Sequence, residues 1–226
     1  MCNHYRNDIR KAGLSTEIYG YEEFSETKIR FDNHPVDIYP DRPAMIGRLQ
    51  DGKIEFTEMR WGFPPPKGEK KLRANTRRLH LAFWRDWLEP KYRCLVPFTS
   101  FAEWIEGSDG KMREMWFAPV SGQLGYIAGI WRPWTGTRGT KAEPVTGDHL
   151  VFSFLTSKPN SEVKAHHDRM PVILADREAQ IEWLRAPSEA VKSFKKPASV
   201  GHLVILPDDN ASTRPQTPAA QGSLPF

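Results

Sequence analysis

The chain has 226 residues, a length that suits one domain, or one domain with a tail. Hydrophobic residues make up 39% of the chain, enough for a core, and no apolar run approaches the ~20 residues that a membrane span needs. The 32 basic and 28 acidic side chains leave a net charge of +4, which allows a polyanionic partner without requiring one. Because there are only two cysteines and the first residues do not form a signal peptide, we expect a cytoplasmic protein without a disulfide framework. We see no phosphate-binding Gly loop, and we expect no cofactor.

Short runs rich in β-branched and aromatic residues, bounded by Gly, Pro or Asp, predict strands. The expected strands cover residues 44–48, 54–60, 93–97, 115–119, 126–131, 150–156, 171–174 and 203–206. Helical patterns cover residues 8–12, 21–25, 79–88, 161–166 and 176–184, the last with Asp176 as its N-cap. Residues 132–147, rich in Gly, Thr and Pro, are expected to form an exposed loop. The pattern predicts a β-rich α+β domain over residues 1–206, with helices at its edges.

The second residue, Cys2, carries the most distinctive chemistry of the chain. Removal of Met1 would leave Cys2 with a free amine and a thiol on adjacent carbons. Such an aminothiol condenses with an aldehyde, because the amine forms an imine and the thiol then closes a thiazolidine ring. A small residue at position two generally permits the loss of Met1, either by self-cleavage or through an aminopeptidase. The alternative is a cysteine that follows the start codon by chance.

Two basic segments suit a nucleic-acid partner. Trp61 precedes a basic run at residues 67–71, and single strands bind where bases stack on rings and cations follow the phosphates. Arg73, Asn75 and Arg77 come next; arginine presents a fork of donors to phosphate, and asparagine both donates and accepts. The alternatives are a core tryptophan beside a solvated loop, and a charged entry to the helix at 79–88.

Two further segments could move protons. Glu103 is a single carboxylate in the apolar stretch around Phe101 and Trp104, where desolvation should raise its pKa and suit it to proton transfer near neutral pH. The alternative is an exposed glutamate at the end of a strand. His167 lies between a short predicted helix and a buried strand, where it can act as an acid or base or can cap the helix.

These residues belong to an ordered set of motifs that resembles the SOS-response-associated peptidase (SRAP) family, whose members process abasic sites in DNA. The matching segments are Met1-Cys2, Met59-Arg60-Trp61-Gly62, Asn75-x-Arg77, Arg93-Cys94-Leu95-Val96-Pro97, Glu103-Trp104, Ala128-Gly129-Ile130-Trp131 and His167-x-Arg169-Met170-Pro171-Val172-Ile173-Leu174. Each segment is weak alone, but the order is specific. The chain departs from the family at Asn3-His4, where members often have Gly-Arg.

The resemblance implies a mostly β domain, with mixed or antiparallel sheets around a basic cleft for single-stranded DNA. It also implies a covalent link between the mature N-terminal cysteine and the abasic sugar, with possible autoproteolytic peptidase and lyase activities. By position in the motifs, the implied catalytic residues are Cys2, Asn75, Glu103 and His167. The implied DNA-binding residues are Trp61, Arg73, Arg77 and Arg169.

Three other functions fit parts of the sequence. A cysteine peptidase would use Cys2 and His167 as nucleophile and base on peptides. A non-covalent binder of single-stranded DNA would need only Trp61 and the arginines. A processed Cys2-Asn3-His4 terminus could also chelate Cu(II) or Ni(II), although nothing else in the chain requires a metal.

The last residues, 207–226, contain four prolines among polar residues and are expected to form a disordered tail. The tail ends in Gln221-Gly222-Ser223-Leu224-Pro225-Phe226, which resembles the short peptide by which bacterial proteins dock to the DNA polymerase sliding clamp. In that interpretation Leu224 and Phe226 fill an apolar pocket, and Gln221 supplies hydrogen bonds. The alternative is a tail that packs on its own domain or has no partner.

Overall fold

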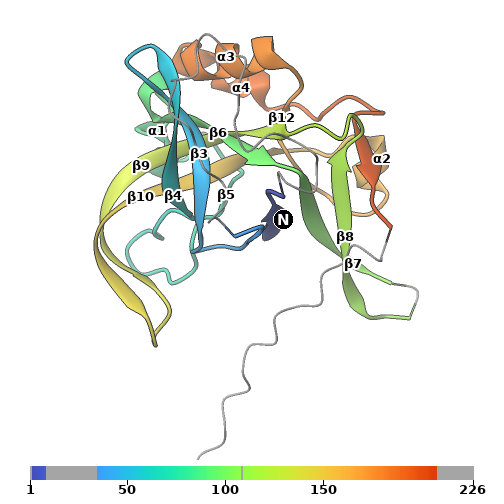
Figure 1. Cartoon of the computed structure of the whole chain (residues 1–226), viewed down its shortest axis with the longest axis horizontal. Helices are drawn as coiled ribbons and strands as arrows, with labels where there is room; N and C mark the ends of the chain where they lie inside the picture. The colour runs from blue at the N-terminus through green and yellow to red at the C-terminus, as the bar shows by residue number, and fades with distance from the viewer. Residues whose placement is uncertain (1, 9–34, 108, 208–226) are drawn as a thin grey trace, which may run out of the picture.

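The computed structural model describes residues 2–8, 35–107 and 109–207. Within these ranges the chain forms two sheets with a few short helices around them, so the predicted β-rich α+β fold is confirmed (Figure 1). Strand positions follow the sequence pattern closely, but several strands are longer than predicted. The short strands β1, β2 and β5 and the longer strand β7 were not predicted.

The first sheet has five antiparallel strands in the order β13-β8-β7-β1-β2. Its strands are β1 (His4–Arg6), β2 (Asp37–Ile38), β7 (Ser100–Glu106), β8 (Met112–Pro119) and β13 (Leu203–Ile205). The short strand β1 lies inside this sheet, because Tyr5 is in register with Phe101 of β7 on one edge and with Ile38 of β2 on the other. The start of the chain is therefore held on both sides.

The second sheet has eight strands and closes on itself. Its strands are β3 (Pro43–Gln50), β4 (Lys53–Trp61), β5 (Asn75–Thr76), β6 (Arg93–Phe98), β9 (Gly125–Gly139), β10 (Pro144–Ser157), β11 (Met170–Pro171) and β12 (Ile173–Leu174). Strand β10 pairs in parallel with β4 and β5 and antiparallel with β9. The strands β4-β3-β6-β9-β10 therefore form a ring, and a mixed sheet becomes a barrel.

The prediction of an exposed loop at residues 132–147 is wrong, because this segment forms the outer half of the β9–β10 hairpin. Figure 1 shows the two strands projecting as a curved arm beyond the barrel. Thr137 lies opposite Thr146 with their hydroxyls 2.8 Å apart, and the rings of Trp134 and His149 stack across the strands. Such cross-strand pairs stabilise a ribbon that composition alone assigns to a loop.

The helices are short and lie at the edges of the sheets. They are α1 (Ala82–Arg85), α2 (Ser161–Lys164), α3 (Arg177–Arg185) and α4 (Val191–Phe194), with 3₁₀ turns η2 (Pro90–Tyr92) and η3 (Ser188–Ala190). The predicted N-cap is confirmed, since Asp176 accepts a hydrogen bond from the Ala179 amide at 2.8 Å. The helices predicted at 8–12 and 21–25 lie outside the described residues apart from Asp8. No helix in the described ranges is long and apolar enough to cross a bilayer.

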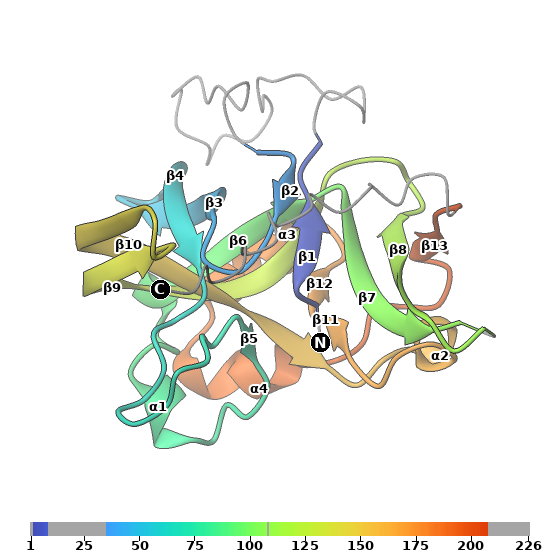
Figure 2. The same ribbon diagram turned by 90° about the horizontal axis from the view of Figure 1, so that it is seen from below.

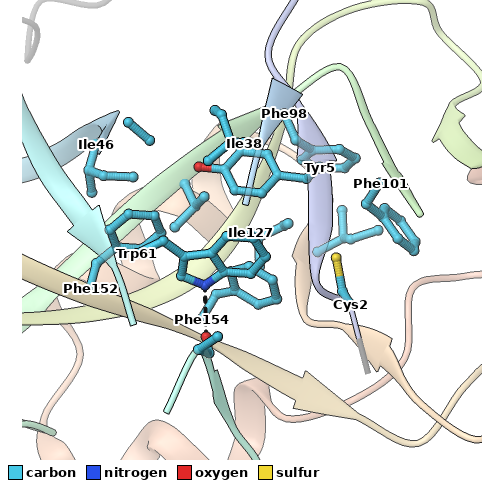
Figure 3. Packing of buried hydrophobic residues seen from close by; sticks show 14 of the residues in the cluster. Cys2, Tyr5, Ile38, Ile46, Trp61, Phe98, Phe101, Ile127, Phe152 and Phe154 are labelled. Atoms are coloured by element: carbon cyan, nitrogen blue, oxygen red, sulfur yellow. Dashed lines mark hydrogen bonds between the residues drawn. The ribbon is translucent and has the colours of Figure 1, made fainter. Parts of the chain in front are cut away.

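The main core fills the space between the two sheets, as Figure 3 shows. Tyr5 of β1 points into it and packs edge-on against Trp61, with the ring centroids 5.2 Å apart. Trp61 stacks on Phe154 with a centroid distance of 5.1 Å. Cys2 is also a member of this cluster and is fully buried. Burial of Tyr5 thus holds the first strand, and with it Cys2, against the barrel.

The His4 side chain is also buried, but among charged groups. Its Nε2 lies 2.8 Å from an oxygen of Asp37, its Nδ1 lies 3.0 Å from Glu114, and its ring stacks on Tyr39. Burial alone would lower the pKa of His4, but the hydrogen bonds to both carboxylates outweigh it and raise the pKa. In turn His4, followed by Arg6, lowers the pKa of Asp37 to about 2. The charged cluster therefore ties β1 to β2 and β8.

This cluster predicts a pH-dependent stability. The pKa of His4 in the folded state exceeds its unfolded value of about 6.5. Its contribution to stability is therefore complete below a pH of about 6.5 and is lost as the pH rises through the folded pKa. The contribution of Asp37 is present above about pH 3.9 and is lost as the pH falls through about 2. We expect His4→Gln to lower the thermal midpoint more at about pH 5 than at about pH 9. The exposed His80→Gln is the control, and equal losses at both pH values would contradict the assignment.

Candidate active site

The structure brings the four predicted catalytic residues together where β1, β5 and β7 approach the segment before β11 (Figure 2). The side-chain amide of Asn75 donates to the Cys2 carbonyl oxygen at 2.8 Å. The Glu103 carboxylate, on β7, is close enough to the Cys2 thiol to raise the pKa of that thiol. Glu103 in turn lies 3.4 Å from His167 Nε2. Residues separated by more than a hundred positions thus form one cluster.

The Cys2 thiol is fully buried and donates a hydrogen bond to the His4 carbonyl oxygen at 3.3 Å. Burial raises the pKa of this thiol well above its ordinary value, and the Glu103 carboxylate raises it further. The sulfur is therefore protonated at neutral pH. A reaction that uses it requires a base to take the proton at the moment of bond formation.

The Glu103 carboxylate is 1% exposed on strand β7. Burial raises its pKa, and the nearby His167 offsets part of this effect. The apolar sequence around Glu103 predicts both this rise in pKa and its cause, which is burial. A carboxyl group with a raised pKa keeps its proton to a higher pH than an exposed carboxyl group does, which favours a role as a general acid–base group.

His167 is able to exchange that proton with Glu103. Its Nδ1 lies 2.9 Å from the Arg169 carbonyl oxygen and 3.2 Å from the Arg169 amide, and it can serve only one of them at a time. With Nδ1 protonated and donating to the carbonyl, the lone pair of Nε2 lies 3.4 Å from Glu103 Oε2. Transfer of a Glu103 proton to Nε2 gives an imidazolium beside a carboxylate, and the reverse transfer restores the neutral pair, so one proton can lie on either residue.

Trp61 does not face solvent, contrary to its assignment as a DNA-binding residue. The ring is 0% exposed, stacks between core phenylalanines, and donates from Nε1 to the Ala74 carbonyl oxygen at 2.9 Å. Ser153 Oγ donates to the same oxygen at 3.0 Å. A buried ring offers no face to a base, so Trp61 instead fixes the backbone that carries Asn75.

The predicted DNA-binding arginines differ in their exposure. Arg73 and Arg77 line a pocket of about 370 Å³ that also contains Asn75, and Arg73 forms an ion pair with Glu69. Arg169 is only 6% exposed, and its guanidinium donates to the Thr156 carbonyl oxygen at 2.6 Å. The pocket is also lined by Arg78, Leu81, Phe83 and Trp84.

A second pocket of about 560 Å³ lies on the His167 side of the cluster. It is lined by Lys158, Pro159, Lys164, Ala165, His166, His167 and Asp168. The two lysines were not singled out from the sequence, although both belong to the polar segment that precedes His167. Each of the two pockets thus contains one of the clustered residues together with several cations.

The alternative of a metal chelate at Cys2-Asn3-His4 does not fit this geometry. Both ring nitrogens of His4 are already hydrogen-bonded, one to Asp37 and one to Glu114. Among residues 2–8, 35–107 and 109–207 no group of three or more Cys, His, Asp or Glu side chains is arranged to hold a metal ion. The clamp motif residues Gln221, Leu224 and Phe226 lie outside the described ranges.

The family sequence model described as "SOS response associated peptidase (SRAP)" matches residues 1–209. The chain therefore belongs to the SRAP family. Two Bacillus subtilis (strain 168) relatives are similar in sequence. The abasic site processing protein YoaM is 33% identical over 149 residues, which cover 62% of this chain and 61% of the relative. The abasic site processing protein YoqW is 33% identical over 135 residues, 56% of each chain. The matches span somewhat more than half of each relative's length.

Solved structures support the same fold. A protein from Bacteroides thetaiotaomicron superposes with a TM-score of 0.68 at 19% identity, covering 99% of this chain and 100% of that one. A protein from Bordetella bronchiseptica gives a TM-score of 0.66 at 22% identity, with coverage of 91% and 100%. At this level of identity the likeness establishes the fold alone.

The buried Glu103 predicts a gain in stability when its charge is removed. Its folded pKa lies above the unfolded value of about 4.3, so the carboxylate destabilises the fold at higher pH and has no such effect below that value. We expect Glu103→Gln to raise the thermal midpoint at about pH 7 and to leave it nearly unchanged at about pH 4. Glu106→Gln, at the exposed end of the same strand, is the matched control. A less stable Gln variant at neutral pH would contradict this interpretation.

Proposed function

We propose that this protein captures abasic sites in single-stranded DNA through a covalent bond to Cys2, exposed as the N-terminus once Met1 is removed. The observation that carries the proposal is the cluster of Cys2, Asn75, Glu103 and His167. The names of the Bacillus relatives, abasic site processing proteins, support the substrate class. The cationic pockets on both sides of the cluster suit a phosphate backbone.

The reaction begins at the amine. An abasic deoxyribose is partly ring-opened, and the neutral amine of Cys2 attacks its aldehyde carbon. Loss of one water gives an imine. The thiol then adds to the imine carbon, its proton passes to the nitrogen, and a thiazolidine ring results. Because burial raises the pKa of the thiol, the amine reacts first and the sulfur second.

The neighbouring side chains divide the remaining work. Glu103 takes the proton from the amine and returns it to the departing water. It later accepts the thiol proton and passes it to the nitrogen. A positioned acid–base group of this kind raises the reaction rate about 10²–10⁴-fold. His167 exchanges protons with Glu103 and protonates the sugar oxygen when the ring opens, and the same step in reverse assists release. Asn75 holds the Cys2 carbonyl and fixes the direction of the amine.

Mass spectrometry tests the covalent step. Protein that lacks Met1, incubated with an abasic single-stranded oligonucleotide, should gain the mass of the oligonucleotide less one water. We expect Cys2→Ala to abolish this product, while Cys94→Ala retains it, because Cys94 is buried in β6 and its amine is part of the peptide chain, so it offers no aminothiol. A full yield of adduct from Cys2→Ala would contradict the proposal.

The same experiment separates the two alternatives from the proposal. A non-covalent binder would give a complex that salt dissociates and no mass increase under denaturing conditions. A peptidase acting on peptides would turn over a peptide substrate and remain indifferent to the abasic oligonucleotide. A Met1-retaining preparation that loses Met1 on its own would identify self-cleavage as the route of maturation.

We further propose the sliding clamp as a partner through residues 221–226, on the strength of the Gln221, Leu224 and Phe226 spacing. Deletion of residues 221–226 should abolish binding to a purified bacterial clamp in a surface-based binding assay. Adduct formation should be unchanged, because the cluster around Cys2 draws on none of these residues. Substitution of Ser223 by Ala, between the anchoring positions, is the control. Equal clamp binding before and after the deletion would dispose of the motif.

A further inference from the structure

Three cations from separate parts of the chain converge beside the candidate active site. Strands β5 and β10 run in parallel, with Asn75 beside Phe154 and Thr76 beside Leu155. One position further along, Arg77 follows β5 and Thr156 continues β10. Thr156 accepts hydrogen bonds from the Arg169 guanidinium through its carbonyl oxygen and its hydroxyl. The two arginines are thus brought together by the strand register.

The third cation is Lys195, which follows helix α4. Its ammonium group donates a hydrogen bond to the carbonyl oxygen of Arg77. No sequence motif indicated this lysine, because it lies in a polar stretch after the last match to the family pattern. Lys195 directly follows α4, whose Val191 and Phe194 are buried in the second core cluster and hold the end of the helix in place.

The described residues supply little negative charge to this group. None of the three cations forms an ion pair with a carboxylate in the described ranges, and the nearest acidic influence on Arg169 is the largely exposed Asp168. The Nε of Arg169 is buried without a hydrogen-bond partner there. Burial lowers the pKa of Lys195, and Arg169 and Arg77 lower it further. Like charges held this close favour an anion between them.

We infer that Lys195 joins Arg77 and Arg169 in binding one phosphodiester of the DNA strand, next to the sugar held at Cys2. The inference rests on the proposed function for the identity of the anion, and it adds a phosphate-binding residue outside the family motifs. Arg77 is exposed in the pocket that contains Asn75, so a phosphate there lies beside the residue that holds the Cys2 carbonyl. Lys195 would fix the strand without taking part in the chemistry.

The test uses an intact single-stranded oligonucleotide, so that its result does not depend on the covalent step. Affinity is measured by fluorescence anisotropy at several salt concentrations. Each phosphate contact contributes about 0.7 to the slope of log K against log salt for single strands. We expect Lys195→Gln to lower the slope by about 0.7 and to weaken binding at low salt. Lys195→Arg should keep the salt slope and the low-salt affinity near those of the native chain.

The control is Lys196→Gln, which removes the same charge from the next, exposed residue. If Lys195→Gln and Lys196→Gln change the slope equally, the inference is overturned, because the effect is then one of general charge. A second result would also overturn the inference. Inorganic phosphate would raise the thermal midpoint of the native chain but not that of Lys195→Gln, while both proteins gave the same salt slope for the oligonucleotide. The site would then bind a free anion. Failure of native protein to form an adduct would contradict the proposed function and leave the slope result standing.

Discussion

The placement of strand β1 is the constraint on which the candidate site depends. The first residues of most chains fray, yet here β1 pairs with β7 through three residues and with β2 through Tyr5 and Arg6, within a five-stranded sheet. Tyr5 enters the core on one side, and His4 is fixed between Asp37 and Glu114. A residue near the start of a chain has only a short peptide segment on one side to hold it. The sheet and these two side chains supply that restraint, and Asn75 completes it at the Cys2 carbonyl.

The second requirement is a firm position for Asn75, and the barrel core provides it. Asn75 belongs to a strand of only two residues, which would have little stability alone. Trp61 and Ser153 both donate to the preceding carbonyl of Ala74, and Thr76 bonds to Ser153 on the other side. The tryptophan of the family motif thus supports Asn75 indirectly, through the carbonyl oxygen of Ala74.

Sequence patterns predicted most of the longer strands, though not β7, together with the N-cap of α3 and the residues of the candidate site, because each depends on local chemistry or on a specific motif. They did not predict strands β1, β2 and β5, since strands of two or three residues carry no periodicity. The burial of Trp61 could not be separated from stacking on DNA by sequence, because an aromatic beside a basic run suits both. The β9–β10 arm was missed because its Gly and Thr residues are typical of loops, while the stabilising pairs connect positions far apart in the segment. The convergence of Arg77, Arg169 and Lys195 likewise depends on strand register.

The buried state of the Cys2 thiol has a consequence for its survival in the cell. Peroxides oxidise thiolates that solvent can reach, and they react slowly with a protonated sulfur enclosed by side chains. Cys2 is enclosed in this way and keeps its proton at neutral pH. Oxidative conditions would therefore leave this sulfur reduced.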